Sequence, residues 1–288
     1  MPVIATRGPC PDIAPIIPTL MAATLRVSRA AWLFAWSGAA MFAASLAFFL
    51  YSYLVRFGRP AAGPGALGPV AIDAALFTLF ALHHSLFARP LVKRWLFGAG
   101  VRPGSDRGQT RVGAGSDQGQ TGVRPGSDLG LTPLERPAYV WVASVLFLTV
   151  CAAWRPVPGE LYHVTGALAL AAYAVHVAGI VLTARGSARL DVLDLAGVRA
   201  VSPSPASHVP LQTHGVYGFV RHPVYFAWVL MVIGTPHMTM TRLTFAAIST
   251  AYLAIAIPFE ERGLLDVFGS EYREYQKRVR WRMIPGVY

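Results

Sequence analysis

Charged residues are scarce in this chain, and their scarcity excludes an ordinary water-soluble domain. Only 14% of the 288 residues are Asp, Glu, Lys or Arg, whereas 54% are hydrophobic. Apolar runs of about 18 or more residues with few charges are typical of helices that span a membrane. The sequence therefore predicts an all-α integral membrane protein.

Acidic residues are the scarcer of the two charge classes. Lys and Arg number 25 against 14 Asp and Glu, which gives a formal net charge of +11. Such a balance can indicate nucleic-acid binding, but here the basic residues lie in loops between apolar runs and in the C-terminal tail. The positive-inside rule and attraction to an anionic membrane surface produce this distribution. We expect membrane lipids, and no nucleic acid, as partners.

Cysteine is also rare, with two residues in the chain. Cys10 and Cys151 are far apart and form no C-x-x-C pair, so neither a disulfide framework nor a zinc site is expected. A formal G-x-G-x-x-G spacing, residues 63–68, follows no strand and contains Pro64. We interpret it as a loop rather than a dinucleotide site.

The apolar runs predict about five to six transmembrane helices, including a C-terminal helical hairpin, and then a basic amphipathic helix on the membrane surface. The predicted spans are residues 30–55, 70–88, 138–154 and 161–184, followed by hairpin arms at 223–236 and 243–258. The corresponding regions are a disordered extension (1–27), two helices (28–100), a repeat loop (101–133), two more helices (134–184) and a cofactor-binding core (185–288).

The repeat loop contains three eleven-residue units that are rich in Gly, Pro, Ser and Asp. Such a composition cannot bury a core, so we expect a flexible loop without chemistry. Basic residues concentrate in this loop, in the loop after residue 184 and in the C-terminal tail. They share one side of the membrane if both termini are cytoplasmic, as expected for a bacterial inner-membrane protein.

Candidate site residues begin in the stretch G-V-Y-G-F-V-R-H-P-V-Y, residues 215–225. Pro223 suits the first turn of a helix, where a missing N–H costs nothing. His222 and Tyr225 are three residues apart and share a face of that turn. The free N–H groups and the positive end of the helix dipole favour a bound anion, with Arg221 beside them.

Two adjacent acids, Glu260 and Glu261, stand directly after the second hairpin arm. A carboxylate next to an apolar run is costly unless it is paired, so a cationic partner is expected. One end of this region attracts anions and the other attracts cations. A cofactor that carries an amino-acid group would satisfy both.

These elements also resemble a known family. R-H-P-x-Y, the hairpin, E-E-R and F-G-S-E-Y-R-E-Y are similar to the superfamily of isoprenylcysteine carboxyl methyltransferases and phospholipid methyltransferases. Further segments resemble its methanethiol S-methyltransferase and NnrU-type branch, namely H-H-S-L-F-A-R, E-R-P-A-Y-V and P-H-M-T at residues 83–89, 135–140 and 236–239.

The resemblance implies an S-adenosylmethionine-dependent membrane methyltransferase. It implies cofactor contacts from Tyr217, His222, Pro223, Tyr225 and Glu261, with Glu260 adjacent. We expect Arg221 and the helix start to hold the cofactor's carboxylate, and the two acids to hold its ammonium or a ribose hydroxyl. Tyr217 or Tyr225 can pack on the adenine, and His222 or His237 can assist deprotonation.

The acceptor is expected to be a small or lipid-soluble thiol such as methanethiol, since a thiolate is already a strong nucleophile. Ala254 stands where the isoprenylcysteine enzymes use an arginine, which disfavours their substrate. One alternative is an NnrU-like isomerase that binds haem through His83, His84 and His176. Another is a non-enzymatic membrane factor of nitrogen-oxide respiration.

Overall fold

The computed structural model describes residues 28–86, 134–187, 192–201 and 210–288. The predicted N-terminal extension and the repeat loop, residues 101–133, therefore lie outside the described residues. Helices dominate, and five of them are long and apolar enough to cross a membrane. The prediction of an all-α integral membrane protein is confirmed.

The N-terminal half supplies three of these helices. They are α1 (Arg29–Tyr51), α2 (Leu67–Leu86) and α4 (Glu135–Ala153), and a π-helical turn (Ser52–Arg56) extends α1. Ser28 caps α1, because its side chain accepts a hydrogen bond from the N–H of Ala31 at 3.1 Å. Arg56 donates to the carbonyls of Cys151 and Ala152 and so satisfies the C-terminal turn of α4.

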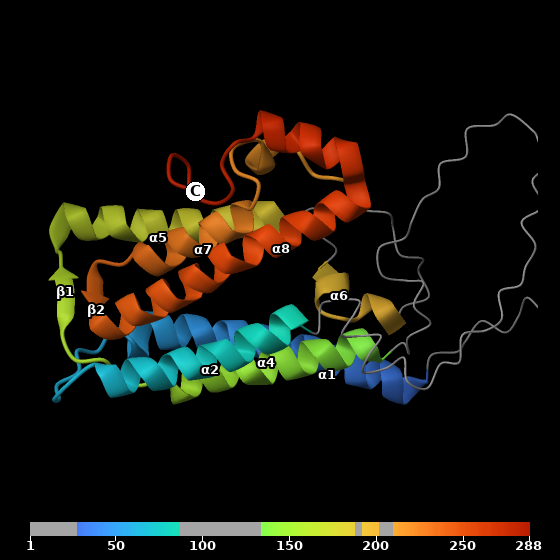
Figure 1. The fold of residues 1–288 in the computed structure, drawn as a ribbon. Helices are drawn as coiled ribbons and strands as arrows, with labels where there is room; N and C mark the ends of the chain where they lie inside the picture. Colours follow the sequence, from blue (N-terminus) through green and yellow to red (C-terminus); the bar gives the residue numbers. More distant parts are fainter. Residues whose placement is uncertain (1–27, 87–133, 188–191, 202–209) are drawn as a thin grey trace, which may run out of the picture.

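The C-terminal half supplies α5 (Gly166–Ser187), the short α7 (Pro223–Ile233) and α8 (Met240–Arg278). Figure 1 shows α5, α7 and α8 in one layer, facing α1, α2 and α4 in the other. Short helical segments, α6 (Val192–Leu195), Arg199–Val201 and Gly215–Gly218, connect α5 to α7.

The two layers meet in an aromatic core. Phe245 of α8 is fully buried and contacts aromatic rings from α1, the π-helical turn, α2, α7 and the end of α4. Its neighbours include Phe49, Tyr53, Phe57, Phe77 and Trp154. Large aromatic side chains bury much apolar area, so this cluster fixes α8 against the N-terminal helices.

Helices α5 and α7 pack more closely, through glycines. A Cβ atom at Gly179 would lie 2.7 Å from the carbonyl oxygen of Ala227, and one at Gly186 would lie 2.9 Å from a methyl carbon of Val224. Only glycine allows this approach of two backbones. The contact holds the first turn of α7 against the last turns of α5.

Two predicted boundaries differ most from the structure. The fourth span, predicted from residue 161, begins instead with a strand, β1 (Glu160–His163), which pairs with β2 (His237–Thr239) in antiparallel register. The second hairpin arm, predicted to end at Pro258, continues through it to Arg278. The helix bends at Gly269, whose φ of 53° lies in the left-handed region.

Pro258 is tolerated because a distant residue replaces the hydrogen bond that it removes. A proline has no N–H, so the carbonyl four residues earlier, that of Ala254, loses its helical partner. The hydroxyl of the C-terminal residue, Tyr288, donates to this carbonyl at 3.3 Å. The residues after α8, 279–288, are called the C-terminal segment, and this segment thus folds back onto α8 above α7 (Figure 1).

Candidate active site

The R-H-P element is fixed by the C-terminal segment before α7 begins. The backbone N–H groups of Arg221 and His222 donate to the carbonyls of Trp281 and Arg282 at 2.9 and 2.8 Å. Pro223 then occupies the first turn of α7, as predicted. This pairing brings the residues that precede α7 and those that follow α8 side by side.

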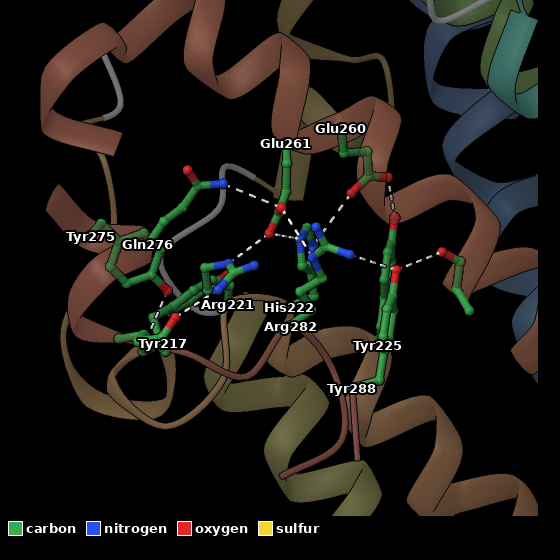
Figure 2. A network of polar contacts seen from close by, with 12 residues as sticks. Tyr217, Arg221, His222, Tyr225, Glu260, Glu261, Tyr275, Gln276, Arg282 and Tyr288 are labelled. Atoms are coloured by element: carbon green, nitrogen blue, oxygen red, sulfur yellow. Dashed lines mark hydrogen bonds and ion pairs between the residues drawn. The ribbon is translucent and has the colours of Figure 1, made fainter. Parts of the chain in front are cut away.

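Glu261 lies at the centre of the cluster and is only 4% exposed. Its Oε1 atom is 2.6 Å from Nε of Arg221 and 3.5 Å from Nε2 of His222. Its Oε2 atom is 3.3 Å from Nε of Arg282 and accepts a hydrogen bond from Gln276 at 3.3 Å. Figure 2 shows these side chains converging on the carboxylate from α8, the R-H-P element and the C-terminal segment. A buried carboxylate needs such partners to remain ionised.

Glu260 points to the other side of His222 and is more open, with its side chain 45% exposed. It accepts a hydrogen bond from the Tyr225 hydroxyl, and its Oε2 atom lies 3.5 Å from Nδ1 of His222. The His222 and Tyr225 rings stack with centroids 5.4 Å apart. His222 therefore lies between two carboxylates, and its buried Nε2 atom has no hydrogen-bond partner among the described residues.

Tyr217 joins the cluster from its flank. Its hydroxyl donates to the carbonyl of Gly186 at 3.2 Å, and its own carbonyl accepts from the Tyr275 hydroxyl at 2.7 Å. Burial raises the pKa of the Tyr217 hydroxyl, which keeps it neutral and able to donate. Tyr217 thus ties the end of α5 to the end of α8 beside the site.

The structure brings together seven predicted residues: Tyr217, Arg221, His222, Pro223, Tyr225, Glu260 and Glu261. The expected separation into an anion-binding and a cation-binding end needs correction. Arg221 contacts Glu261 directly and also donates to the carbonyls of Val279 and Arg280 at 2.7 and 3.0 Å. Much of its hydrogen-bonding capacity is therefore used within the protein.

His237 does not join this cluster. It lies in β2, beyond the far end of α7, whose 11 residues separate it from His222 by on the order of 16 Å along the helix axis. There its Nε2 atom contacts Glu160 at 2.8 Å, and its ring stacks on His163. His237 cannot take a proton at the same centre as His222.

The histidines considered as haem ligands have other contacts and do not meet. Nδ1 of His176 donates to the carbonyl of Met231 at 2.8 Å, in the last turn of α7. Nδ1 of His84 is 2.9 Å from the Tyr139 hydroxyl, and the ring of His83 stacks on the Tyr139 ring. Within the part of the chain that the structure describes, no three His, Cys, Asp or Glu side chains gather as metal ligands.

Three residues of the cluster were missed by sequence reasoning: Gln276, Arg282 and Tyr288. Arg282 and Tyr288 stand in the tail R-W-R-M-I-P-G-V-Y, and the basic residues around them read as a membrane-surface segment. Arg282 also lies with its guanidinium over the Tyr288 ring, 5.3 Å from its centroid. Only the fold shows that this tail returns to Glu261.

An apolar groove of about 170 Å³ adjoins the cluster at Tyr225. Its polar groups are turned away, because Trp228 donates to Ser249 and Thr183 donates to the carbonyl of Gly179. Its walls come from α5, α7 and α8: Thr183, Val224, Tyr225, Trp228, Met231 and Leu253. Another cavity, of about 220 Å³, lies beside Arg56 and Trp154 at the opposite end of the helices, away from this chemistry.

The combined site offers ionic groups of both signs next to a small apolar space. Charged groups at the end of apolar helices recognise a zwitterionic ligand, and a groove without free polar atoms suits an uncharged partner. His222 and Tyr225, whose rings stack on each other, lie at the boundary between the two.

Comparison with known proteins gives consistent matches. The isoprenylcysteine carboxyl methyltransferase (ICMT) family matches residues 200–265, which include the R-H-P element and both glutamates. The chain is 29% identical to methanethiol S-methyltransferase 2 of Bradyrhizobium diazoefficiens, over 80% of each chain. It is 32% identical to the methanethiol S-methyltransferase of Pseudomonas deceptionensis, over 75% of this chain and 74% of the relative. It is 35% identical to a protein-S-isoprenylcysteine O-methyltransferase of Dictyostelium discoideum, over 27% of this chain and 34% of the relative. No solved structure matches the chain.

Proposed function

Because this chain belongs to the membrane methyltransferase family of the methanethiol S-methyltransferases, we propose that it transfers a methyl group from S-adenosylmethionine to a small or lipid-soluble thiol. Methanethiol is the acceptor that the names of several relatives give. The observation that carries the proposal is the cluster around Glu261, which combines fixed carboxylates, two guanidinium groups and an adjoining apolar groove.

The residues present fit the methyl donor. S-adenosylmethionine carries an ammonium and a carboxylate, and when bound it supplies a methyl group activated by a positively charged sulfur. Glu260 and Glu261 are suited to the ammonium or a ribose hydroxyl, and a guanidinium group of the cluster to the carboxylate. His222 and Tyr225, whose rings already stack on each other, offer a flat surface for the adenine.

The chain's contribution to the reaction is position and desolvation. The acceptor sulfur forms the new bond to the methyl carbon, and the electron pair of the broken bond remains on the donor's sulfur. His222 can assist in removing the thiol proton, and Glu260, whose Oε2 atom lies 3.5 Å from Nδ1 of His222 and which is partly exposed, can carry a proton on to solvent. Because the sulfur is an intrinsically good nucleophile, holding the two reactants in line can account for much of the acceleration.

The groove supports a small apolar acceptor. Its volume of about 170 Å³ accepts a molecule of a few heavy atoms, and its walls offer no free polar group for a carboxylate. Its position between membrane helices would let a lipid-soluble thiol enter from the bilayer. We also propose that the site and both termini face the cytoplasm of a bacterial inner membrane, since the basic loops would then share the cytoplasmic side.

The test is methyl transfer by the purified full-length chain in lipid vesicles. With S-adenosylmethionine that carries a labelled methyl group and with methanethiol, we expect labelled dimethyl sulfide, detected by gas chromatography. The variant Glu261→Gln should form far less product, while Glu274→Gln, an exposed glutamate on the same helix, should retain the activity. Folded protein that forms no methylated thiol with any small acceptor would refute the proposal.

A further inference from the structure

We propose that Arg282, rather than Arg221, is the residue that takes the carboxylate of the methyl donor, by exchanging its contact with Glu261 for the ligand. This inference rests on the proposed function, since it assigns a binding residue within the same site. It concerns a residue outside the segment 200–265 that the family match covers.

The two arginines differ in how firmly the protein holds them. The Arg221 side chain is 6% exposed, contacts Glu261 at 2.6 Å and donates to two backbone carbonyls of the C-terminal segment. To release Arg221 would leave those carbonyls without their donor and would remove the shortest contact of a buried carboxylate, which is costly. Arg221 is therefore a positioning residue that fastens the C-terminal segment to α8.

Arg282 has the opposite character. Its side chain is 38% exposed, its contact with Glu261 is longer at 3.3 Å, and its other hydrogen bond goes to the Tyr288 hydroxyl at 3.2 Å. Partly exposed ion pairs of this length contribute little, so the guanidinium can move without a large penalty. In the described part of the chain its Nη2 atom has no hydrogen-bond partner.

The backbone holds Arg282 where such a movement is useful. Its carbonyl accepts the N–H of His222 at 2.8 Å, which fixes its Cα atom beside the start of α7. Figure 2 shows its guanidinium among His222, Glu261 and Tyr288, at the centre of the cluster. The side chain can therefore swing while its attachment point stays next to the site.

The exchange conserves charge pairing. An α-amino acid carries its ammonium and carboxylate on one carbon atom, so it can enter between two opposite charges that are in contact. The ligand's carboxylate would bind Arg282 through two guanidinium nitrogens, and the ammonium would take the Oε2 atom of Glu261 that Arg282 leaves. Arg221 stays on Oε1 throughout and keeps Glu261 in place.

The test compares two donors in calorimetric titrations of the full-length protein in detergent. S-adenosylmethionine and its decarboxylated analogue differ by the carboxylate alone. A charge-assisted contact predicts that the wild type binds S-adenosylmethionine about tenfold to a hundredfold more tightly than the analogue. Arg282→Gln should remove this preference by weakening only the complete donor. Arg280→Gln, an exposed arginine two residues away, should keep it.

The outcomes separate the inference from the proposed function. If Arg282→Gln binds both donors as the wild type does, or if it binds both more weakly by the same factor, Arg282 does not bind the carboxylate and the inference is wrong. If the folded wild type binds neither donor, the proposed function itself fails. An unchanged thermal unfolding temperature of Arg282→Gln checks that its fold is intact.

Discussion

The hydrogen bond from Tyr288 to Ala254 gives a prediction about how α8 continues through Pro258. The variant Tyr288→Phe keeps the ring beneath Arg282 but removes the hydroxyl. The Ala254 carbonyl then loses the donor that replaces the helical N–H which proline lacks. A polar group left without its partner away from water costs about 1–3 kcal/mol, so the free energy of unfolding should fall by that amount.

A second substitution isolates this effect. Pro258→Ala supplies the missing N–H, so the Ala254 carbonyl regains a helical partner in either background. Tyr288→Phe should therefore cost clearly less in the Pro258→Ala protein than in the wild type, and the difference is the coupling energy. Reversible unfolding of all four proteins in mixed detergent micelles, followed by circular dichroism, measures it. An equal cost of Tyr288→Phe in both backgrounds would show that the reasoning about Pro258 is wrong.

Three further predictions concern packing, the histidine of α5 and the repeat. Gly179→Val should separate α5 from α7 and sharply reduce the yield of folded protein on size-exclusion chromatography, because even its Cβ would lie 2.7 Å from the Ala227 carbonyl. His176→Ala should lower the unfolding free energy by about 1–3 kcal/mol in a denaturation series, since the Met231 carbonyl loses its donor. It should leave donor affinity in calorimetry nearly unchanged, and a large loss would place it in the site. Deletion of residues 101–133 should leave membrane insertion and donor affinity unchanged, as fractionation and calorimetry can show.

Much of the fold could be predicted, because the lengths of the apolar runs in a membrane protein indicate where its transmembrane helices lie. The predicted span 30–55 coincides closely with α1 and its π-helical extension, since the bilayer sets how many apolar residues are needed. The strand pairing of β1 with β2 could not be predicted in this way. Each strand has only three or four residues, and their partners are more than 70 positions apart.

The site was predictable only where its residues adjoin in sequence. Pro223 reports the start of α7 through its missing N–H, and Glu260 and Glu261 stand out because acids rarely follow an apolar run. The contact of Arg221 with Glu261 spans 40 residues, and the return of Tyr288 to Ala254 spans 34. Such contacts depend on how the helices pack, which local patterns do not encode.

Pro258 is a position where a local sequence pattern predicted the wrong end of a helix. A proline after a long apolar arm is an ordinary sign that a helix ends, so the arm was predicted to stop there. The helix continues because the C-terminal residue supplies a donor from outside it. The rule that proline ends a helix depends on the missing N–H, and here the tertiary contact from Tyr288 replaces the lost hydrogen bond.

The most direct test of the central claim is the affinity of the protein for S-adenosylmethionine when the charge of Glu261 is removed. Glu261→Gln keeps the shape of the side chain, and a charge-assisted hydrogen bond contributes about 1.5–3 kcal/mol. Calorimetric titration should therefore show roughly tenfold to hundredfold weaker binding than in the wild type or in Glu274→Gln. Equal affinity of all three folded proteins would contradict the placement of the methyl donor at this cluster.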